Sequence, residues 1–361
     1  MELKRTPLED DHKRLGAKMA PFGGWLMPIE YAGVLTEHRA VREAVGMFDL
    51  THLGKVDVRG EGALAWLQRI VTNDLSELAP GEAQYNLVLT EQGGIVDDLI
   101  VYRTGEAEYL VVPNAGNTDR ILGILREGAP GGVEIAHRPD LATIAVQGPA
   151  AFDLVTPRFP AAEKLDFMTH AEADFDGAPV LIARSGYTGE RGVELFVPDG
   201  AAGALWEELL EAGRWLGLEP AGLAARDTLR LEMGYPLHGS DITDERTPLE
   251  ALLSWAVAFD KGEFTGRDAL LRMREAGVPA RLRGLRMTGR LIPRPHYAVL
   301  SGDRRVGETT SGTFSPTLRV GIAMAYLDPD VELGQVVEVD VRGKRGGAEV
   351  VRPPFVDASP K

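Results

Sequence analysis

The sequence predicts an α+β protein in which two lobes of mixed strands and helices precede a small all-β domain. Helical and extended segments alternate over residues 1–275, and several extended segments are close enough in the chain to pair as hairpins. Beyond residue 276 helical periodicity stops, and short extended segments follow with turn residues at regular spacing. We therefore expect a first region of residues 1–275, with divisions near residues 50, 140 and 220, and a C-terminal domain of residues 276–361 closed as a barrel or sandwich.

Apolar residues that recur at three- and four-residue intervals predict helices within the first region. The segments with this pattern are residues 63–70, 117–125, 201–216, 223–233 and 267–274. Short apolar runs predict strands at residues 85–90, 94–103, 108–113, 143–147 and 179–184. The first two runs flank Gly93 and Gly94. Because glycine supplies the positive φ that a tight turn needs, we expect these two strands to form a hairpin.

Composition and charge exclude several classes of protein. The 361 residues include no cysteine, which excludes a disulfide framework, a thiolate zinc site and a cysteine nucleophile. No apolar run approaches the ~18 residues of a membrane span, and the formal net charge of −15 argues against nucleic acid, whose binding depends on neutralising phosphates. The N-terminus lacks the apolar core of a secretory signal and is too acidic for a transit peptide. We expect a cytoplasmic protein that binds neither membranes nor nucleic acids.

The sequence also lacks the motifs of several cofactor and nucleophile sites. It contains no GxxxxGK[ST] phosphate loop, no GxGxxG after a strand and no GxSxG nucleophile turn. Its seven histidines include no pair at the spacing of metal ligands. We expect no metal and no nucleotide, and a chemistry that relies on carboxylates and arginines.

Two adjacent carboxylates, Asp97 and Asp98, interrupt an otherwise apolar predicted strand. Since side chains alternate along a strand, Asp97 shares a face with Ile95 and Leu99, and Asp98 points to the other face. A buried carboxylate needs a partner, so a bulge where the aspartates cap backbone N–H groups is one interpretation. The other is a carboxylate in a cleft that orients or deprotonates an amine. Alternation alone does not choose between the two aspartates.

Two other charged segments are also open to a structural interpretation. Residues 184–194 join two strands through a glycine turn, a pattern typical of a hairpin with surface charges. Arg226 and Arg230 lie one turn apart on the predicted helix 223–233, a spacing typical of a solvated stripe of ion pairs.

Ten blocks of sequence, in order and spanning nearly the whole chain, resemble the aminomethyltransferase (T protein) family of the glycine cleavage system. They are FGGWLMPIEY (22–31), GMFDLTHLGKVDVRG (46–60), TNDL (72–75), QYNLVLTEQGGIVDDLIVYR (84–103), AVQGP (145–149), RSGYTGERGVELF (184–196), GLAARDTLRLEMGYPLHGSDI (222–242), TPLEA (247–251), FTGRDAL (264–270) and SGTFSPTL (311–318). The resemblance implies a multidomain cloverleaf that binds tetrahydrofolate in a central cavity, with a β-barrel-like C-terminal domain. Residues 1–275 would then be the folate-binding catalytic region.

The resemblance also implies a reaction and the residues that perform it. A lipoyl arm of the H protein delivers an aminomethyl group, and tetrahydrofolate, as co-substrate, captures the one-carbon unit at N5. The products are 5,10-methylenetetrahydrofolate, ammonia and dihydrolipoyl H protein. Asp97 is implied as the catalytic aspartate, Glu194 as the group that accepts two adjacent pterin N–H donors, and Arg226 as the planar donor that supports the pterin. Further cavity residues implied by the resemblance are Tyr85, Asn114, Tyr187 and Tyr235.

Two other functions stay open on sequence alone: a tetrahydrofolate-dependent demethylase of another small substrate, and a non-catalytic folate-binding regulatory protein. Flavin-fused relatives are excluded because the chain has no room for a flavin domain and no dinucleotide motif. Folate-binding iron–sulfur-repair proteins carry a cysteine motif that this chain lacks. The joint presence of Asp97, Glu194 and Arg226 favours catalysis.

The negative net charge conceals a basic segment. Residues 261–320 hold twelve Lys and Arg against five Asp and Glu, so the rest of the chain is still more acidic than the total suggests. This segment is either an exposed basic face without a partner or a surface that steers acidic partners by long-range attraction. We expect the second, with the lipoylated H protein and the polyglutamate tail of folate as the partners.

Overall fold

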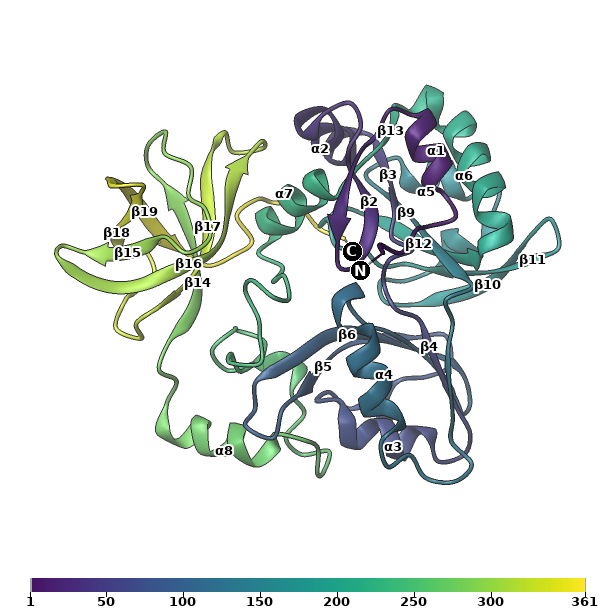
Figure 1. Cartoon of the computed structure of the whole chain (residues 1–361), viewed down its shortest axis with the longest axis horizontal. Helices are drawn as coiled ribbons and strands as arrows, with labels where there is room; N and C mark the ends of the chain where they lie inside the picture. Colours follow the sequence, from purple (N-terminus) through teal and green to yellow (C-terminus); the bar gives the residue numbers. More distant parts are fainter. Residues whose placement is uncertain (1, 361) are drawn as a thin grey trace.

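The computed structural model describes residues 2–360, and Figure 1 shows three lobes arranged around a common centre. The fold is α+β, as the sequence predicts. The helices are α1 (Glu9–Arg14), α2 (Val34–Glu43), α3 (Ala63–Ile70), α4 (Thr118–Arg126), α5 (Ala151–Val155), α6 (Asp199–Gly213), α7 (Leu223–Met233) and α8 (Arg267–Ala276), with 3-10 turns η1 (Leu75–Glu77), η2 (Ala115–Asn117), η3 (Pro160–Lys164), η4 (Arg214–Leu216) and η5 (Ser254–Ala256). Within the described residues, no helix is long and apolar enough to cross a membrane.

The first lobe is built on a six-stranded sheet of order β10-β11-β12-β9-β3-β13. Neighbouring strands in this sheet are antiparallel, except for β13 and β3, which run parallel to each other. Helices α5 and α6 pack against β9 and β12, where Trp206 and Phe159 are fully buried. Near the N-terminus, β1 and β2 form a separate two-stranded antiparallel sheet. The strands are β1 (Lys18–Phe22), β2 (Trp25–Glu30), β3 (Val45–Asp49), β9 (Leu141–Gln147), β10 (His170–Phe175), β11 (Ala178–Ala183), β12 (Gly192–Pro198) and β13 (Leu218–Pro220).

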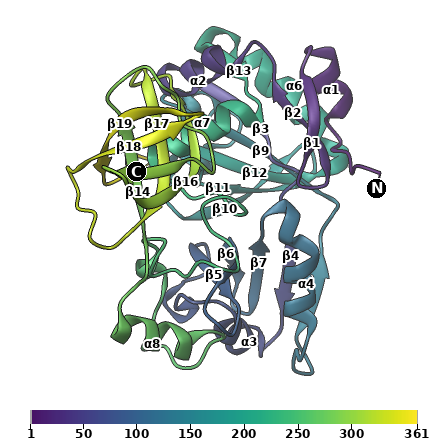
Figure 2. The same cartoon turned by 60° about the vertical axis from the view of Figure 1, so that its left-hand side comes forward.

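The second lobe is an antiparallel sheet of order β5-β6-β7-β4-β8, which Figure 2 shows below the first lobe. Helices α3 and α4 cover one face, and the other face packs on the first lobe through Tyr102 and Phe196. The predicted hairpin is confirmed as β5 paired with β6. The strands are β4 (Val56–Arg59), β5 (Ala83–Leu89), β6 (Ile95–Gly105), β7 (Glu108–Val112) and β8 (Glu134–His137).

A bulge in this hairpin corrects one expectation about Asp97. Val88 pairs with Asp97 and Leu89 pairs with Ile95, so Val96 is the extra residue. Asp97 lies on the same face of the sheet as Leu99, which packs against α3 and α4. Ile95, which was expected on that face too, belongs to a different hydrophobic cluster. The sequence allowed a bulge next to the hairpin turn, and the structure has one there.

The third lobe is a closed barrel of order β14-β17-β16-β15-β18-β19, which confirms the predicted all-β domain. Its strands are β14 (Arg281–Met287), β15 (Ala298–Ser301), β16 (Arg304–Ser315), β17 (Val320–Leu327), β18 (Val336–Val341) and β19 (Lys344–Val351). Helix α7 ends at Gly234, whose φ of 69° suits glycine and whose Cα lies against Pro353 of the C-terminal segment. The barrel and the C-terminal tail thus both meet α7.

Buried charges on α7 fasten the barrel to the first lobe. Arg230 is 2% exposed, donates to Asp241 at 2.6 Å and to Ser311 of the barrel at 2.8 Å. The predicted solvated stripe is therefore wrong for this arginine. Glu232 is fully buried and accepts from Ser315 at 2.5 Å and from the Thr317 hydroxyl at 2.8 Å. These hydrogen bonds hold the end of β16, and the turn that follows it, against α7.

The five predicted helices are all present, with ends within three residues of those expected. The periodicity failed to predict α1, α2 and α5. In α2 the reason is visible, because its buried face carries Glu37 and His38 beside Val41 and so breaks the apolar pattern. The Glu37 carboxylate accepts from the backbone N–H groups of Tyr31 and Gly222, which supplies the partners that a buried charge needs.

Candidate active site

The two aspartates of β6 point to opposite faces of the second-lobe sheet. Asp97 is fully buried and accepts from the Asn114 backbone N–H at 3.0 Å, from Asn114 Nδ2 at 2.9 Å and from Asn117 Nδ2 at 2.6 Å. Asp98 is half-buried and accepts from the Tyr85 hydroxyl at 3.0 Å and from Asn114 Nδ2 at 2.8 Å. Asn114 therefore bridges both carboxylates.

The pair holds protons more tightly than ordinary carboxyls do. Burial, and after it the charge of Asp98, raises the pKa of Asp97 to about 7, against the opposing hydrogen bonds from Asn117 and Asn114. Burial also raises the pKa of Asp98, opposed by the Tyr85 hydroxyl. Because like charges this close interact strongly, the two groups titrate as a pair that holds a proton near neutral pH.

Asp98, rather than Asp97, faces the space shared with the first lobe. Alternation along β6 puts Asp98 on the same face as Tyr102, whose hydroxyl donates to Glu194 on β12 at 3.3 Å. Asp97 lies on the face covered by α3 and α4. The resemblance assigned the direct catalytic role to Asp97, whereas this geometry favours its neighbour for contact with a substrate.

Glu194 and Arg226 come together from β12 and α7. The Ser185 hydroxyl donates to Glu194 at 2.6 Å, so the expected surface charge is in fact a buried carboxylate. The Arg226 guanidinium lies 4.7 Å from the centre of the Tyr187 ring. Its Nη1 is buried, and within residues 2–360 it has no hydrogen-bond partner. Burial lowers the pKa of Arg226, opposed by the charge of Glu194. An unpaired buried donor of this kind calls for a ligand acceptor.

A stack of two tyrosines completes the set of predicted residues. Tyr187 stacks on Tyr235 with ring centres 5.7 Å apart, and its hydroxyl donates to the Pro236 carbonyl. Burial raises the pKa of Tyr187, and the charge of Asp98 adds to this effect, as expected for groups that lie close together. Hydrogen bonds and ring contacts place the predicted residues in three groups: Asp97, Asn114 and Tyr85 linked through Asp98, Glu194 with Tyr102 and Ser185, and Arg226 with Tyr187 and Tyr235. The charge of Asp98 acts on Tyr187 and that of Glu194 acts on Arg226, and these electrostatic interactions join the three groups into one network.

Sequence reasoning missed several members of this network. Trp255 of η5 stacks on Tyr85 with ring centres 5.2 Å apart, and it is 64% exposed. An exposed aromatic ring of this kind has a free face on which another flat ring can stack. Tyr102 could have been found from the i, i+4 relation to Asp98 along the strand, but Trp255 could not, because it comes from a distant turn. The other missed residues are Ser185, Asn117 and His238.

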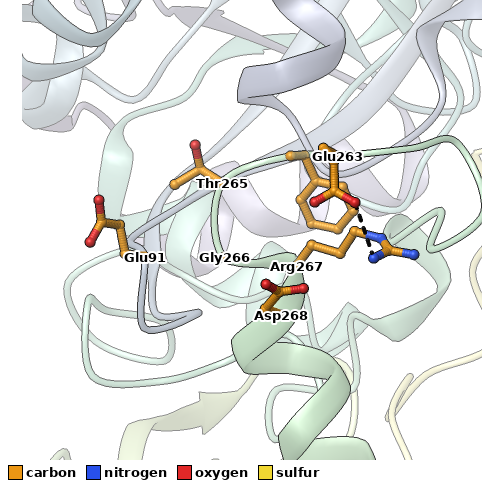
Figure 3. A pocket seen from close by; sticks show the side chains of 7 residues that line it. Glu91, Glu263, Thr265, Gly266, Arg267 and Asp268 are labelled. Carbon is orange, nitrogen blue, oxygen red and sulfur yellow. Dashed lines mark hydrogen bonds and ion pairs between the residues drawn. The ribbon is translucent and has the colours of Figure 1, made fainter.

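The surface also has a hollow that lies apart from these residues. Figure 3 shows a pocket of about 260 Å³ at the start of α8, where Glu263 pairs with Arg267 at 3.4 Å. It is lined mainly by charged groups, and none of the predicted site residues belongs to it. Among the residues described, no cluster of three or more His, Asp or Glu side chains could hold a metal ion.

Comparisons with known proteins agree with this architecture. Residues 8–261 match the family model described as the GCVT N-terminal domain, and residues 281–357 match the glycine cleavage T-protein C-terminal barrel domain. Aminomethyltransferases of Mycobacterium tuberculosis (strain ATCC 25618 / H37Rv) and Frankia alni are each 52% identical to the chain. The first match covers 98% of this chain and 97% of the relative, and the second covers both fully.

A solved structure extends the comparison to the fold. The glycine cleavage system aminomethyltransferase T of Bartonella henselae matches with a TM-score of 0.92 and 36% identity, over 99% of each chain. This match confirms the predicted multidomain cloverleaf with its C-terminal barrel. The chain therefore belongs to the glycine cleavage T-protein family of aminomethyltransferases.

Proposed function

We propose that the chain transfers the one-carbon unit of an aminomethyl group, carried on the lipoyl arm of the H protein, to tetrahydrofolate. The products are ammonia, 5,10-methylenetetrahydrofolate and dihydrolipoyl H protein. One observation carries the proposal: the buried Arg226 Nη1, which has no hydrogen-bond partner within residues 2–360, and an aspartate pair whose pKa values burial raises lie in the same network. The first suits a bound acceptor ring, and the second suits acid–base work on an amine.

The residues of the site fit a pterin and its attached aromatic ring. Glu194 can accept from two adjacent pterin N–H donors, and the unpaired Arg226 Nη1 can donate to a ring acceptor. Trp255, already stacked on Tyr85, offers its exposed face to the next ring of the folate. Tyr187, Tyr235 and Asn114 would then line the space between.

We assign different tasks to the two aspartates. Asp98, on the substrate-facing side, would orient the amine and accept or return a proton. Asp97, beneath the sheet, would hold Asn114 in the position from which it also donates to Asp98. Positioning two reactants can lower the barrier by up to ~7–11 kcal/mol, so most of the rate enhancement comes from placement.

The decisive test incubates the protein with tetrahydrofolate and aminomethylated H protein while ammonia release is measured. Ammonia that depends on both components supports the proposal. Folate-dependent methyl transfer from a different small donor, without ammonia, would indicate the demethylase. Folate binding without any turnover would indicate the regulatory protein.

Glu194→Ala is expected to weaken tetrahydrofolate binding about 10- to 100-fold, because a charged hydrogen-bond acceptor for the pterin is lost. The dissociation constant measured by calorimetry checks this. Glu172→Ala, an exposed position on β10 of the same sheet, is the matched control and should leave binding unchanged. An unaltered dissociation constant in Glu194→Ala would remove this residue from the folate site.

The basic segment is smaller in the structure than the sequence suggests. Lys261 is not available to a partner, because it donates to Gln68 and to the Val71 and Asn73 carbonyls. Several barrel arginines are paired with acids, as in the 2.6 Å contact between Arg286 and Glu349. Among the described residues, the exposed arginines of the segment without an ion pair are Arg272, Arg274, Arg281, Arg290, Arg294 and Arg319.

Three of these arginines form what we call the barrel-end patch: Arg290, Arg294 and Arg319. The loop 291–294 lies against Gly312 of β16 and Gly321 of β17, the two strands that are joined by the turn carrying Arg319. We propose that it attracts the acidic H protein and the folate polyglutamate tail. The association rate with H protein should fall about tenfold between ~20 and ~200 mM salt. Arg290→Glu should weaken this salt dependence and Arg59→Glu, on the second lobe, should not; a salt-independent rate would contradict the assignment.

A further inference from the structure

His238 lies in the loop that follows α7 and lines a surface cavity of about 400 Å³. The folate contacts and the acid–base step proposed above make no use of this histidine. The cavity is otherwise lined by Arg120, Gly239, Thr243, Asp244 and Glu245. The imidazole is bonded on both ring nitrogens, and one of those bonds leads to the aspartate pair.

The hydrogen-bond partners of His238 determine which nitrogen carries its proton. Nε2 lies 3.2 Å from the Ile95 carbonyl oxygen, which can only accept, so the hydrogen is on Nε2. Nδ1 lies 3.1 Å from Asn117 Nδ2. Since an amide nitrogen can only donate, Nδ1 must be the acceptor, and the imidazole must be neutral.

The same amide group then points at the buried aspartate. Asn117 Nδ2 has two hydrogens: one goes to His238 Nδ1, and the other goes to Asp97 Oδ1 at 2.6 Å. Asp97 in turn shares Asn114 with Asp98. A continuous chain of hydrogen bonds therefore runs from the cavity wall, through Asn117, to the carboxylate that faces the substrate side.

We propose that His238 is a positioning residue: by accepting from Asn117, it aims the amide N–H at Asp97 and so sets how the aspartate pair holds its proton. The effect on turnover rests on the proposed function, whereas the effect on the aspartates does not. Without an acceptor at this position, the Asn117 amide can rotate, and Asp97 loses a bond that favours its charged form. The charged groups that face the imidazole or line the same cavity are Asp97 and Asp98 from β6, Arg120 from α4, and Asp244 and Glu245 from its own loop.

The first test is independent of catalysis. In the full chain labelled with ¹³C at aspartate Cγ, the Asp97 signal is identified by its loss in Asp97→Asn and then titrated. We expect its midpoint to move upward from near pH 7 by about one pH unit in His238→Phe, and to return in His238→Asn, whose side-chain oxygen can accept in place of Nδ1. His137→Phe, on the edge strand β8, is the matched control and should leave the midpoint unchanged.

The second test measures transfer with aminomethylated H protein. We expect His238→Phe to lower kcat about tenfold while KM for tetrahydrofolate stays within about twofold, and His238→Asn to restore kcat to within about threefold. If the wild-type protein shows no transfer, the proposed function fails, but the aspartate titration still decides the role of His238.

Two results would overturn the inference. The first is an Asp97 midpoint in His238→Phe that equals that of the unaltered protein. The second needs no variant: ¹⁵N spectra of the imidazole in the unaltered protein should show the hydrogen on Nε2, and a hydrogen on Nδ1 would exclude the acceptor role. This measurement also keeps the inference testable if His238→Phe does not fold.

Discussion

Asp98→Asn is expected to lower kcat for aminomethyl transfer by about 10²–10⁴-fold while tetrahydrofolate still binds. The asparagine oxygen can accept from Asn114 Nδ2 while its N–H₂ group donates to the Tyr85 hydroxyl oxygen, and the side chain occupies nearly the same volume, so the fold and the folate contacts should persist. What is lost is a carboxylate whose pKa burial raises and which can take up a proton. Single-turnover rates with aminomethylated H protein, together with a dissociation constant for folate, measure the two effects separately.

Asp97→Asn is the matched variant, and it should behave differently. Its new amide N–H₂ group would face the donors Asn114 and Asn117, which already direct their N–H groups at this position. We therefore expect it to lower the free energy of unfolding by about 1–3 kcal/mol in addition to slowing transfer. If Asp98→Asn kept full activity and Asp97→Asn lost it without loss of stability, the assignment implied by resemblance alone would be the correct one.

Glu232→Ala is expected to have the largest effect on stability, lowering the free energy of unfolding by about 3–5 kcal/mol. The change leaves the Arg42 guanidinium, now 2.9 Å from the carboxylate, without its buried partner, and it removes the acceptor for Ser315 and Thr317. Urea denaturation followed by tryptophan fluorescence measures the loss. Glu349→Ala is the control: its pair with Arg286 is partly exposed, so it should cost less than about 1 kcal/mol.

Acid should weaken the same contact. Burial alone would raise the pKa of Glu232, but the hydrogen bond and charge of His38, followed by Ser315 and Arg42, outweigh it and lower the pKa to about 2. A carboxyl whose pKa is lowered on folding stabilises the protein above its unfolded value, and that contribution is lost as pH falls from about 4.5 towards 2. Stability in Glu232→Ala should therefore change less over this range than stability in the unaltered protein.

The parts of the fold that follow local rules could be predicted. Helices α3 and α7 have continuous apolar stripes, and the β5–β6 turn has its glycines, so each was found where it lies. Helix α2 was missed because its buried face carries polar groups whose partners come from elsewhere in the chain. The spacing of apolar residues does not reveal a helix face on which a charged side chain is buried and hydrogen-bonded to a distant backbone group.

The site, too, could be predicted only where it depends on local patterns in the sequence. Alternation placed the aspartates on opposite faces of the strand, but only the packing of the two sheets tells which face meets the first lobe. The sequence predicted a surface position for Arg230, because its hydrogen-bond partner Ser311 lies 81 positions further along the chain. Trp255 reaches Tyr85 from a turn with no local pattern that would signal the contact.

Helix α7 carries Arg226, which we propose contacts folate, and, one turn further on, the charges that fasten the barrel. On the proposed function, we therefore expect folate binding and barrel attachment to be thermodynamically linked through this helix. A folate concentration of 100 times Kd adds about 2.7 kcal/mol to the cost of any opening that unravels this helix. Amide hydrogens of β16, far from the pterin contacts, should accordingly exchange more slowly when folate is bound. Under this proposal, folate bound at the centre of the molecule would help to keep the third lobe attached to α7.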